Sequence, residues 1–170
     1  ENIYDLGAVP GIRPRYFLQM TGLSLTTGRN RHEVLNKLLD FDEGANPSLQ
    51  QILATLSEAI DGVGCVLAGE DGVPLAFTKS LAEKADQYAA VGSQLFRRTG
   101  RYLETIAGDG VDCLALPASN PPLLLFSVNG IYLSVVQDDK HAGQRQFKKA
   151  YAVAREIGWL LGKRAIVRGG

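Results

Sequence analysis

Few side chains in this sequence are placed where they could carry out acid–base or metal chemistry together. The two histidines, His32 and His141, have no cysteine or pair of carboxylates at the spacing of a metal site. We therefore expect both to be surface residues. Acid–base catalysis would need carboxylates that converge in space, and the simpler interpretation of the acidic runs is that they are solvated turns. These runs are Asp40/Asp42/Glu43, Glu70/Asp71, Asp138/Asp139, and Asp109 with Asp112.

The two cysteines and the known nucleotide and nucleophile motifs do not point to catalysis either. Cys65 and Cys113 each lie in an expected apolar strand, which favours two small buried side chains. A disulfide framework or a metal site would need more ligands at closer spacing. The sequence contains no phosphate-binding G-x-x-x-x-G-K-[ST] loop and no G-x-S-x-G nucleophile elbow. We expect no catalytic, cofactor-binding or metal-binding residue, and therefore no enzyme.

Three arginines form the clearest cluster of one charge. Arg97, Arg98 and Arg101 fall on the polar side of an expected long helix. One hypothesis is that they dock an acidic or phosphate-bearing partner, and the other is that they are an ordinary solvated helix face. Nothing in the surrounding sequence supports an arginine finger.

The composition is that of one ordinary globular domain. The 170 residues include 18 Lys and Arg and 18 Asp and Glu, so the formal charge is zero. This balance argues against a general nucleic-acid footprint, which needs clustered excess base. No apolar run approaches the roughly 20 residues that span a bilayer, and no signal-peptide pattern opens the chain. We expect a cytoplasmic protein whose natural start lies upstream of Glu1.

Residues 1–47 are expected to be an extension packed on the domain, since they are too few to form a core of their own. A capping box of Asn30 and Glu33 predicts a short helix there, with an apolar side formed by Val34, Leu35, Leu38 and Phe41. The domain itself is expected at 48–164, followed by a frayed tail at 165–170. Trp159 is either an exposed anchor for a partner or, as we prefer, covered by Tyr16, Phe17 and Leu18 of the extension.

The rest of the chain predicts an alternation of helices and strands. Ser48 and Gln51 form a capping box before an amphipathic helix over Leu49–Ile60, and Gly62 is expected to end it. Asp71-Gly72 and Asn129-Gly130 predict tight hairpins with primed turns. Pro74 lacks an N–H, so its strand should lie at an edge of the sheet. The strands are expected at Gly64–Gly69, Val73–Thr78, Val111–Pro117, Leu123–Val128 and Ile131–Gln137, and the later helices at Ala82–Ile106 and from Ala142 to Gly162 or Arg164.

The middle helix carries more apolar surface than one sheet needs. Its stripe includes Ala85, Tyr88, Ala89, Gly92, Leu95, Phe96, Thr99, Leu103 and Ile106, and Val91 and Tyr102 widen it. A helix that covers one sheet face needs a stripe somewhat wider than 100°. The excess is buried either on a partner or on further neighbours inside one monomer, and both interpretations stay open. Gly92 and Gly100 weaken the helix, and a break near Gly100 is one expectation.

This order of elements predicts an α/β (α+β) fold with a five-stranded antiparallel sheet and helices on both faces. It resembles the Roadblock / dynein light-chain family, whose fold is profilin-like, over about Leu49 to Arg164. The resemblance is carried by the helix Leu49–Ile60, the Gly62-Val63-Gly64 step, Asp71-Gly72 with Pro74-Leu75-Ala76, the Ala85/Ala89/Ala90 helix and Gly130-Ile131-Tyr132-Leu133. The extension 1–47 and the stretch 100–110 depart from the compact family pattern.

The resemblance implies a dimer in which two sheets join edge to edge and the long helices pack together. The long helix would then lie on one face of the sheet and the other two helices on the opposite face. It also implies a scaffold or regulator of a Ras-like small GTPase, and bacterial MglB-like members stimulate GTP hydrolysis through the GTPase's own residues. The expected interface comprises Tyr88, Gly92, Leu95, Phe96, Thr99, Val111 and Cys113, with Arg97, Arg98 and Arg101 docking the partner. The alternatives are a GAF- or PAS-type small-molecule sensor and a secretion-type chaperone.

Overall fold

The computed structural model describes residues 28–107, 111–138 and 144–167. The helices are α3 (Gly28–Leu38), α4 (Leu49–Ala59), a 3-10 helix (Lys79–Lys84), α5 (Ala85–Ala107) and α6 (Gln144–Val167). The strands are β1 (Gly62–Ala68), β2 (Pro74–Phe77), β3 (Cys113–Leu116), β4 (Leu123–Val128) and β5 (Ile131–Gln137).

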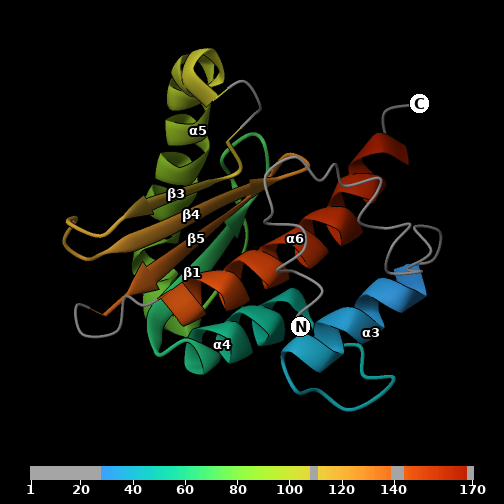
Figure 1. Ribbon diagram of the computed structural model, residues 1–170. Coiled ribbons are helices and arrows are strands. Elements are labelled where there is room, and N and C mark those ends of the chain that lie inside the picture. The colour runs from blue at the N-terminus through green and yellow to red at the C-terminus, as the bar shows by residue number, and fades with distance from the viewer. Residues whose placement is uncertain (1–27, 108–110, 139–143, 168–170) are drawn as a thin grey trace.

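The five strands form one antiparallel sheet in the order β2-β1-β5-β4-β3. Helix α5 covers one face of the sheet, and α4 and α6 cover the other (Figure 1). Helix α3 packs on α6, outside this layer. The predicted fold class, a five-stranded sheet between one long helix and two others, is confirmed.

Two hydrophobic cores hold these layers together. The larger one joins α3, α4 and α6 to the sheet and contains the fully buried Leu35, Leu53 and Phe126. The smaller one lies under α5 and contains Val66, Ala89 and Val136. Both faces of the central strands are therefore buried, as expected for a sheet with helices on both faces.

The N-terminal extension contributes to the larger core through α3. Leu35 and Leu39 are 0% and 3% exposed in that core, so this helix is integrated with the domain. Residues 1–27 and 168–170 lie outside the described residues, as do His141, Asp109 and Asp139. Trp159 is half-buried, and the segment predicted to cover it lies in the undescribed part.

The boundaries of α4 differ from the prediction at only one end. The Ser48 hydroxyl accepts from the Gln51 backbone N–H at 3.2 Å, and the Gln51 side chain accepts from the Ser48 N–H at 2.8 Å. This confirms the capping box. The prediction that Gly62 ends the helix is wrong, because Asp61 is the residue with positive φ (51°) and Gly62 already begins β1. A short acidic side chain tolerates this left-handed conformation.

The two hairpins use different turns. Asn129 and Gly130 both have positive φ, at 51° and 76°, which confirms the primed turn between β4 and β5. Between β1 and β2 only Gly72 has positive φ (75°), and its N–H donates to the Gly69 carbonyl. The primed turn expected at Asp71-Gly72 is therefore wrong. The hairpin instead has a turn that ends in one glycine with a left-handed backbone conformation. The pairing register between β1 and β2 shifts after Leu67.

Several strands and helices begin or end at other residues than predicted. Strand β2 is shorter than predicted and lies at an edge of the sheet, as Pro74 indicated. Strand β3 covers only Cys113–Leu116. The long helix begins with a 3-10 turn at Lys79–Lys84, and it continues without a break through Gly100 to Ala107.

Candidate interaction surface

Helix α5 carries two apolar stripes that face different directions. The first consists of the buried Ala85, Ala89 and Phe96, which face the sheet. The second stripe, called here the outer stripe, is half-buried or exposed and recurs every three or four residues, as in a coiled-coil seam. Its members are Tyr88, Val91, Leu95, Thr99, Tyr102 and Ile106.

The outer stripe is most exposed at the C-terminal end of α5. Val91 is 42% exposed, Tyr102 is 75% exposed and Ile106 is 84% exposed. Phe96 is the last buried residue of the helix, and a Cβ added at Gly100 would meet nothing within 4 Å. The end of α5 therefore extends beyond the sheet, as Figure 1 also shows.

The contacts of α5 decide which edge of the sheet the outer stripe faces. On one flank, Ala90 and Ser93 approach Gly72 of the β1–β2 turn. Beneath the helix, Gly92 lies against Leu125 of β4 and Ser134 of β5. The outer stripe lies on the remaining flank, so it faces the β4 and β3 side of the sheet.

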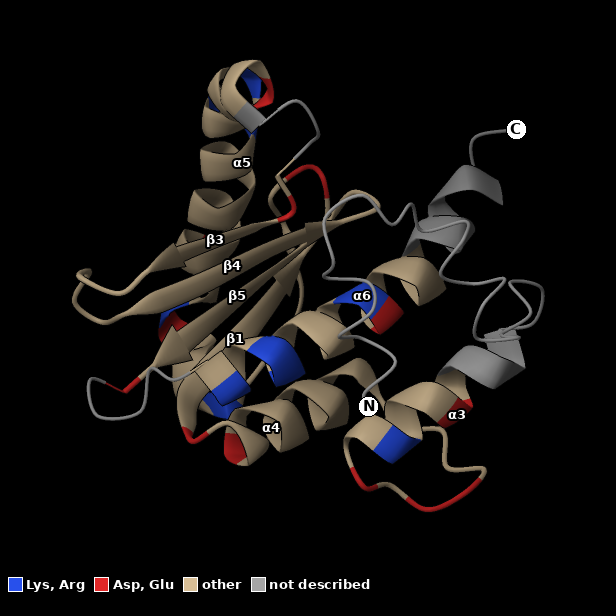
Figure 2. Ribbon diagram, viewed as in Figure 1, with Lys and Arg blue, Asp and Glu red and all other residues tan. Residues whose placement is uncertain are grey.

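Strand β3 forms the edge of the sheet on that same side. Its register with β4 pairs Leu116 with Leu123, a contact residue of the core under α5. Leu114 and Leu116 thus face the α5 side, because alternate residues of a strand share a face. Neither proline nor charge lies within Cys113–Leu116, and Figure 2 draws the whole strand tan. Native proteins usually protect a free edge with such residues, whereas β3 contains none of them, and among the described residues no strand pairs with its outer side.

The structure divides the seven residues predicted for the interface into three groups. Tyr88, Leu95 and Thr99 belong to the outer stripe and are half-buried. Gly92 and Phe96 instead lie under the helix, and the Phe96 ring packs 5.9 Å from that of Tyr132. The latter two are therefore placed against the chain's own sheet rather than on its open surface.

Val111 and Cys113, the other two predicted residues, lie at the β3 edge. Val111 is half-buried just before the strand, and Cys113 packs against the core on the α6 side. Along this edge, these residues offer their backbone N–H and C=O groups, more than their side chains, for pairing with another strand. The seven residues predicted for the interface did not include Val91, Tyr102 and Ile106. The width of the apolar stripe in the sequence was the signal that pointed to these three positions.

The surroundings of both cysteines keep their thiols protonated. Burial raises the pKa of the Cys65 thiol to about 12. Burial, with the neighbouring Asp112 carboxylate, raises the pKa of Cys113 to about 11. The Tyr151 hydroxyl donates to that carboxylate, and burial followed by this hydrogen bond raises the pKa of Tyr151. Because the thiolate is the reactive form, neither cysteine is set up as a nucleophile.

The three arginines have different surroundings. The Arg97 guanidinium donates from Nη2 to the Glu70 carbonyl oxygen at 2.6 Å, which ties α5 to the β1–β2 turn. Arg98 and Arg101 are exposed, and within the described residues their guanidinium groups form no such bond. Figure 2 shows both basic and acidic residues at the projecting end of α5, where Glu104 is also exposed. The basic surface open to a partner is therefore centred on Arg98 and Arg101.

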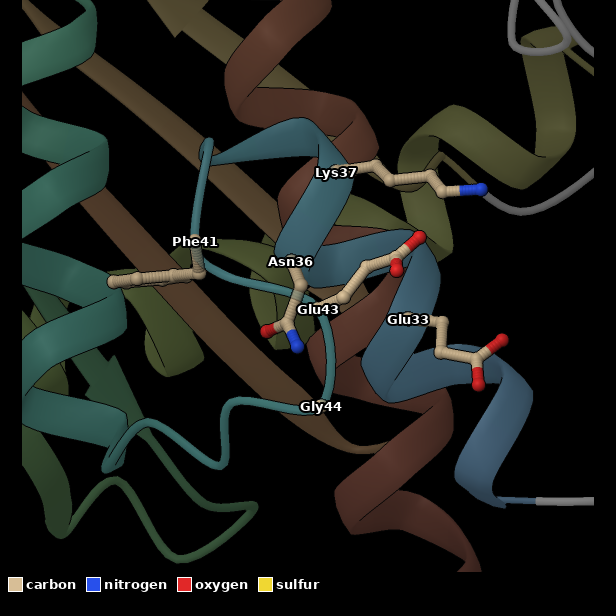
Figure 3. Close-up of a pocket in the computed structure, with 6 residues that line it drawn as sticks. All are labelled: Glu33, Asn36, Lys37, Phe41, Glu43 and Gly44. Carbon is tan, nitrogen blue, oxygen red and sulfur yellow. The ribbon is translucent and has the colours of Figure 1, made fainter.

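A pocket of about 400 Å³ lies beside α3, but its lining does not form a ligand site. Figure 3 shows that its side chains diverge: Phe41 points toward α4, while Lys37 and Glu33 point away. The Asn36 amide, 3% exposed, donates to the Ala45 carbonyl at 2.8 Å and so fastens the following loop. A small-molecule site needs a few polar groups that converge on one ligand, and this pocket gives the sensor alternative no support.

The described residues contain neither a cluster of metal ligands nor a membrane-spanning helix. Within 28–107, 111–138 and 144–167, no three or more His, Cys, Asp or Glu side chains come together to hold a metal ion. None of the helices in these ranges is both long enough and apolar enough to span a bilayer.

Comparison with known proteins identifies the fold. No protein-family model and no curated protein sequence matches the chain. Among solved structures, Myxococcus xanthus MglB is similar with a TM-score of 0.56 and 11% identity, over 64% of this chain and 89% of that one. A Roadblock/LC7 domain from Streptomyces avermitilis is similar with a TM-score of 0.53 and 18% identity, over 72% of this chain and 99% of that one. The predicted resemblance is thus confirmed in three dimensions, and the chain has the Roadblock/LC7 fold that it shares with MglB.

Proposed function

We propose that this protein is a dimeric, non-catalytic interaction module that regulates or scaffolds a Ras-like small GTPase. One observation carries the proposal: the outer stripe of α5 and the open edge of β3 lie on the same side of the molecule. Roadblock-type domains generally are not catalysts, and here the site consists of contact surface rather than reactive groups.

The outer stripe offers enough apolar surface for a second copy. From Tyr88 to Ile106 it extends over about 27 Å, at 1.5 Å per residue. Its most exposed members are one aromatic and one aliphatic side chain, Tyr102 and Ile106. Burying a large apolar side chain contributes about 1.5–3 kcal/mol, and twofold symmetry makes every contact occur twice.

The two edges of the sheet favour one mode of pairing. Pro74 removes an N–H from the β2 edge, whereas every residue of β3 retains its backbone donor and acceptor. Pairing two β3 strands would extend the sheet from one copy to the other. In that arrangement the two α5 helices would lie on the same face of the joined sheet, with their outer stripes near each other.

The GTPase partner rests on the likeness to MglB and on the basic end of α5. Arg98 and Arg101 are exposed next to the apolar Tyr102. Together they present positive charge and an aromatic side chain, which suit an acidic protein surface. Any activation of GTP hydrolysis would act through the GTPase's own residues, as the resemblance to MglB-like proteins implies.

Size-exclusion chromatography with light scattering tests the proposal directly. The full chain should elute as a dimer at micromolar concentration and should form a larger complex with a Ras-like GTPase loaded with GTP or GDP. Replacing Arg98 and Arg101 by Glu should weaken that complex in a pull-down assay. A monomer that carries a co-purified small molecule would contradict the proposal and favour a sensor, and unchanged binding of this double variant would remove Arg98 and Arg101 from the docking surface.

A further inference from the structure

Helix α5 loses the support of the sheet at one definite point. Phe96 is 7% exposed and packs on the Tyr132 ring, and no residue from Arg97 to Ile106 is buried. A Cβ at Gly100 would meet open space. The last turns of the helix, residues 98–106, therefore project from the sheet with no fully buried side chain, and only Thr99, Gly100 and Leu103 among them stay half-buried.

Arg97 occupies the first position beyond this point. Its guanidinium donates to the Glu70 carbonyl at 2.6 Å, a hydrogen bond strengthened by the charge of the donor. The Glu70 side chain in turn lies against the β4–β5 turn, since a Cβ at Gly130 would meet its Oε1 at 2.5 Å. The bond thus connects the start of the projecting segment to the tip of the β1–β2 hairpin, beside which the β4–β5 turn lies.

The length of the projecting segment amplifies small changes at this point. Ile106 lies nine residues beyond Arg97, about 13 Å along the helix axis, so a tilt of about 10° would displace it by about 2 Å. Apolar surfaces that pack against each other do not tolerate displacements of that size. The direction of α5 at Arg97 therefore decides where Tyr102 and Ile106 are presented.

We infer that Arg97 is a positioning residue, which holds the projecting end of α5 at the angle that the partner surface requires, rather than a residue that touches the partner. The inference rests on the proposed function, because it assigns a role within the same surface. It separates Arg97 from Arg98 and Arg101, which the sequence places in one cluster.

Hydrogen–deuterium exchange of the full chain, diluted until it is monomeric, tests the inference. Arg97→Ala should speed exchange of the amides in 98–107 about fivefold, because one charged hydrogen bond no longer restrains the segment. Arg97→Lys keeps a charged donor and should restore most of the protection. Arg98→Ala is the matched control, a neighbouring exposed arginine without that bond, and should leave exchange unchanged.

Sedimentation analysis at several salt concentrations provides the second readout. Arg97→Ala should raise the dimer Kd at least threefold without changing its salt dependence, since the lost contact lies within one chain. Equal exchange in Arg97→Ala and Arg98→Ala would overturn the inference, as would an altered salt dependence with unchanged exchange. If the wild-type chain never dimerises, the proposed dimer fails, whereas the exchange experiment still decides the role of Arg97.

Discussion

Truncating Ile106 to Ala tests the outer stripe at its most exposed position. The substitution removes three carbon atoms, and each buried carbon contributes about 0.8 kcal/mol. Ile106 is 84% exposed in the single chain, so most of this energy, about 2 kcal/mol, is still available to a partner. In a symmetric dimer the loss occurs twice, about 4 kcal/mol, which corresponds to roughly a thousandfold increase in Kd.

The same substitution should leave the folded monomer almost unchanged, because exposed positions away from special contacts rarely matter by more than about 0.5 kcal/mol. Dimer dissociation should be followed by sedimentation, and monomer stability by urea unfolding at a concentration below the Kd. Leu75→Ala is the matched control: Leu75 is 50% exposed and lies on β2, at the opposite edge of the sheet. If Ile106→Ala and Leu75→Ala change Kd equally, the end of α5 is not part of an interface and the reasoning from its exposure is refuted.

Three further predictions concern the fold that supports this surface. Gly158→Ala should destabilise the chain by about 1–3 kcal/mol, because its Cβ would lie 2.6 Å from a valine side chain of β4. Gly100→Ala should instead stabilise the chain by about 0.5–1 kcal/mol, since a Cβ at this helical position meets open space. Equal changes of the two variants in thermal unfolding would contradict both predictions. Ser48→Ala should cost about 1 kcal/mol in urea unfolding through loss of the α4 capping box, and an unchanged midpoint would show that the box is not stabilising. In the folded chain the pKa of Cys113 is raised from 9.0 to about 11, and that of Cys65 to about 12. The stability that comes from burying these neutral thiols is fully present below pH 9, where they are neutral in both the folded and the unfolded state. This contribution should be lost as the pH rises from about 9 toward 12, because the unfolded thiols ionise first. Cys113 should also react with iodoacetamide before Cys65, and rapid alkylation of either at pH 8 would be inconsistent with these shifts.

Local patterns were sufficient where neighbouring residues decide the structure. The Ser48 capping box, the Asn129-Gly130 turn and the edge position of Pro74 each depend on the geometry of a few adjacent residues, and each prediction is confirmed. Local patterns gave the wrong prediction where either of two neighbouring residues could adopt the left-handed backbone conformation. Asp61 rather than Gly62 adopts the left-handed conformation, and Gly72 alone does so in the first hairpin.

The sequence by itself determined that α5 carries more apolar surface than one sheet can cover, since the width of a helical stripe follows from residue spacing alone. Only the tertiary structure decided which part of that stripe stays open. It places Gly92 and Phe96 under the helix, leaves Tyr102 and Ile106 in solvent, and ties Arg97 but neither Arg98 nor Arg101 to a distant turn. These distinctions depend on where the helix leaves the sheet, and that point is set by contacts between residues far apart in the chain, which no local pattern contains.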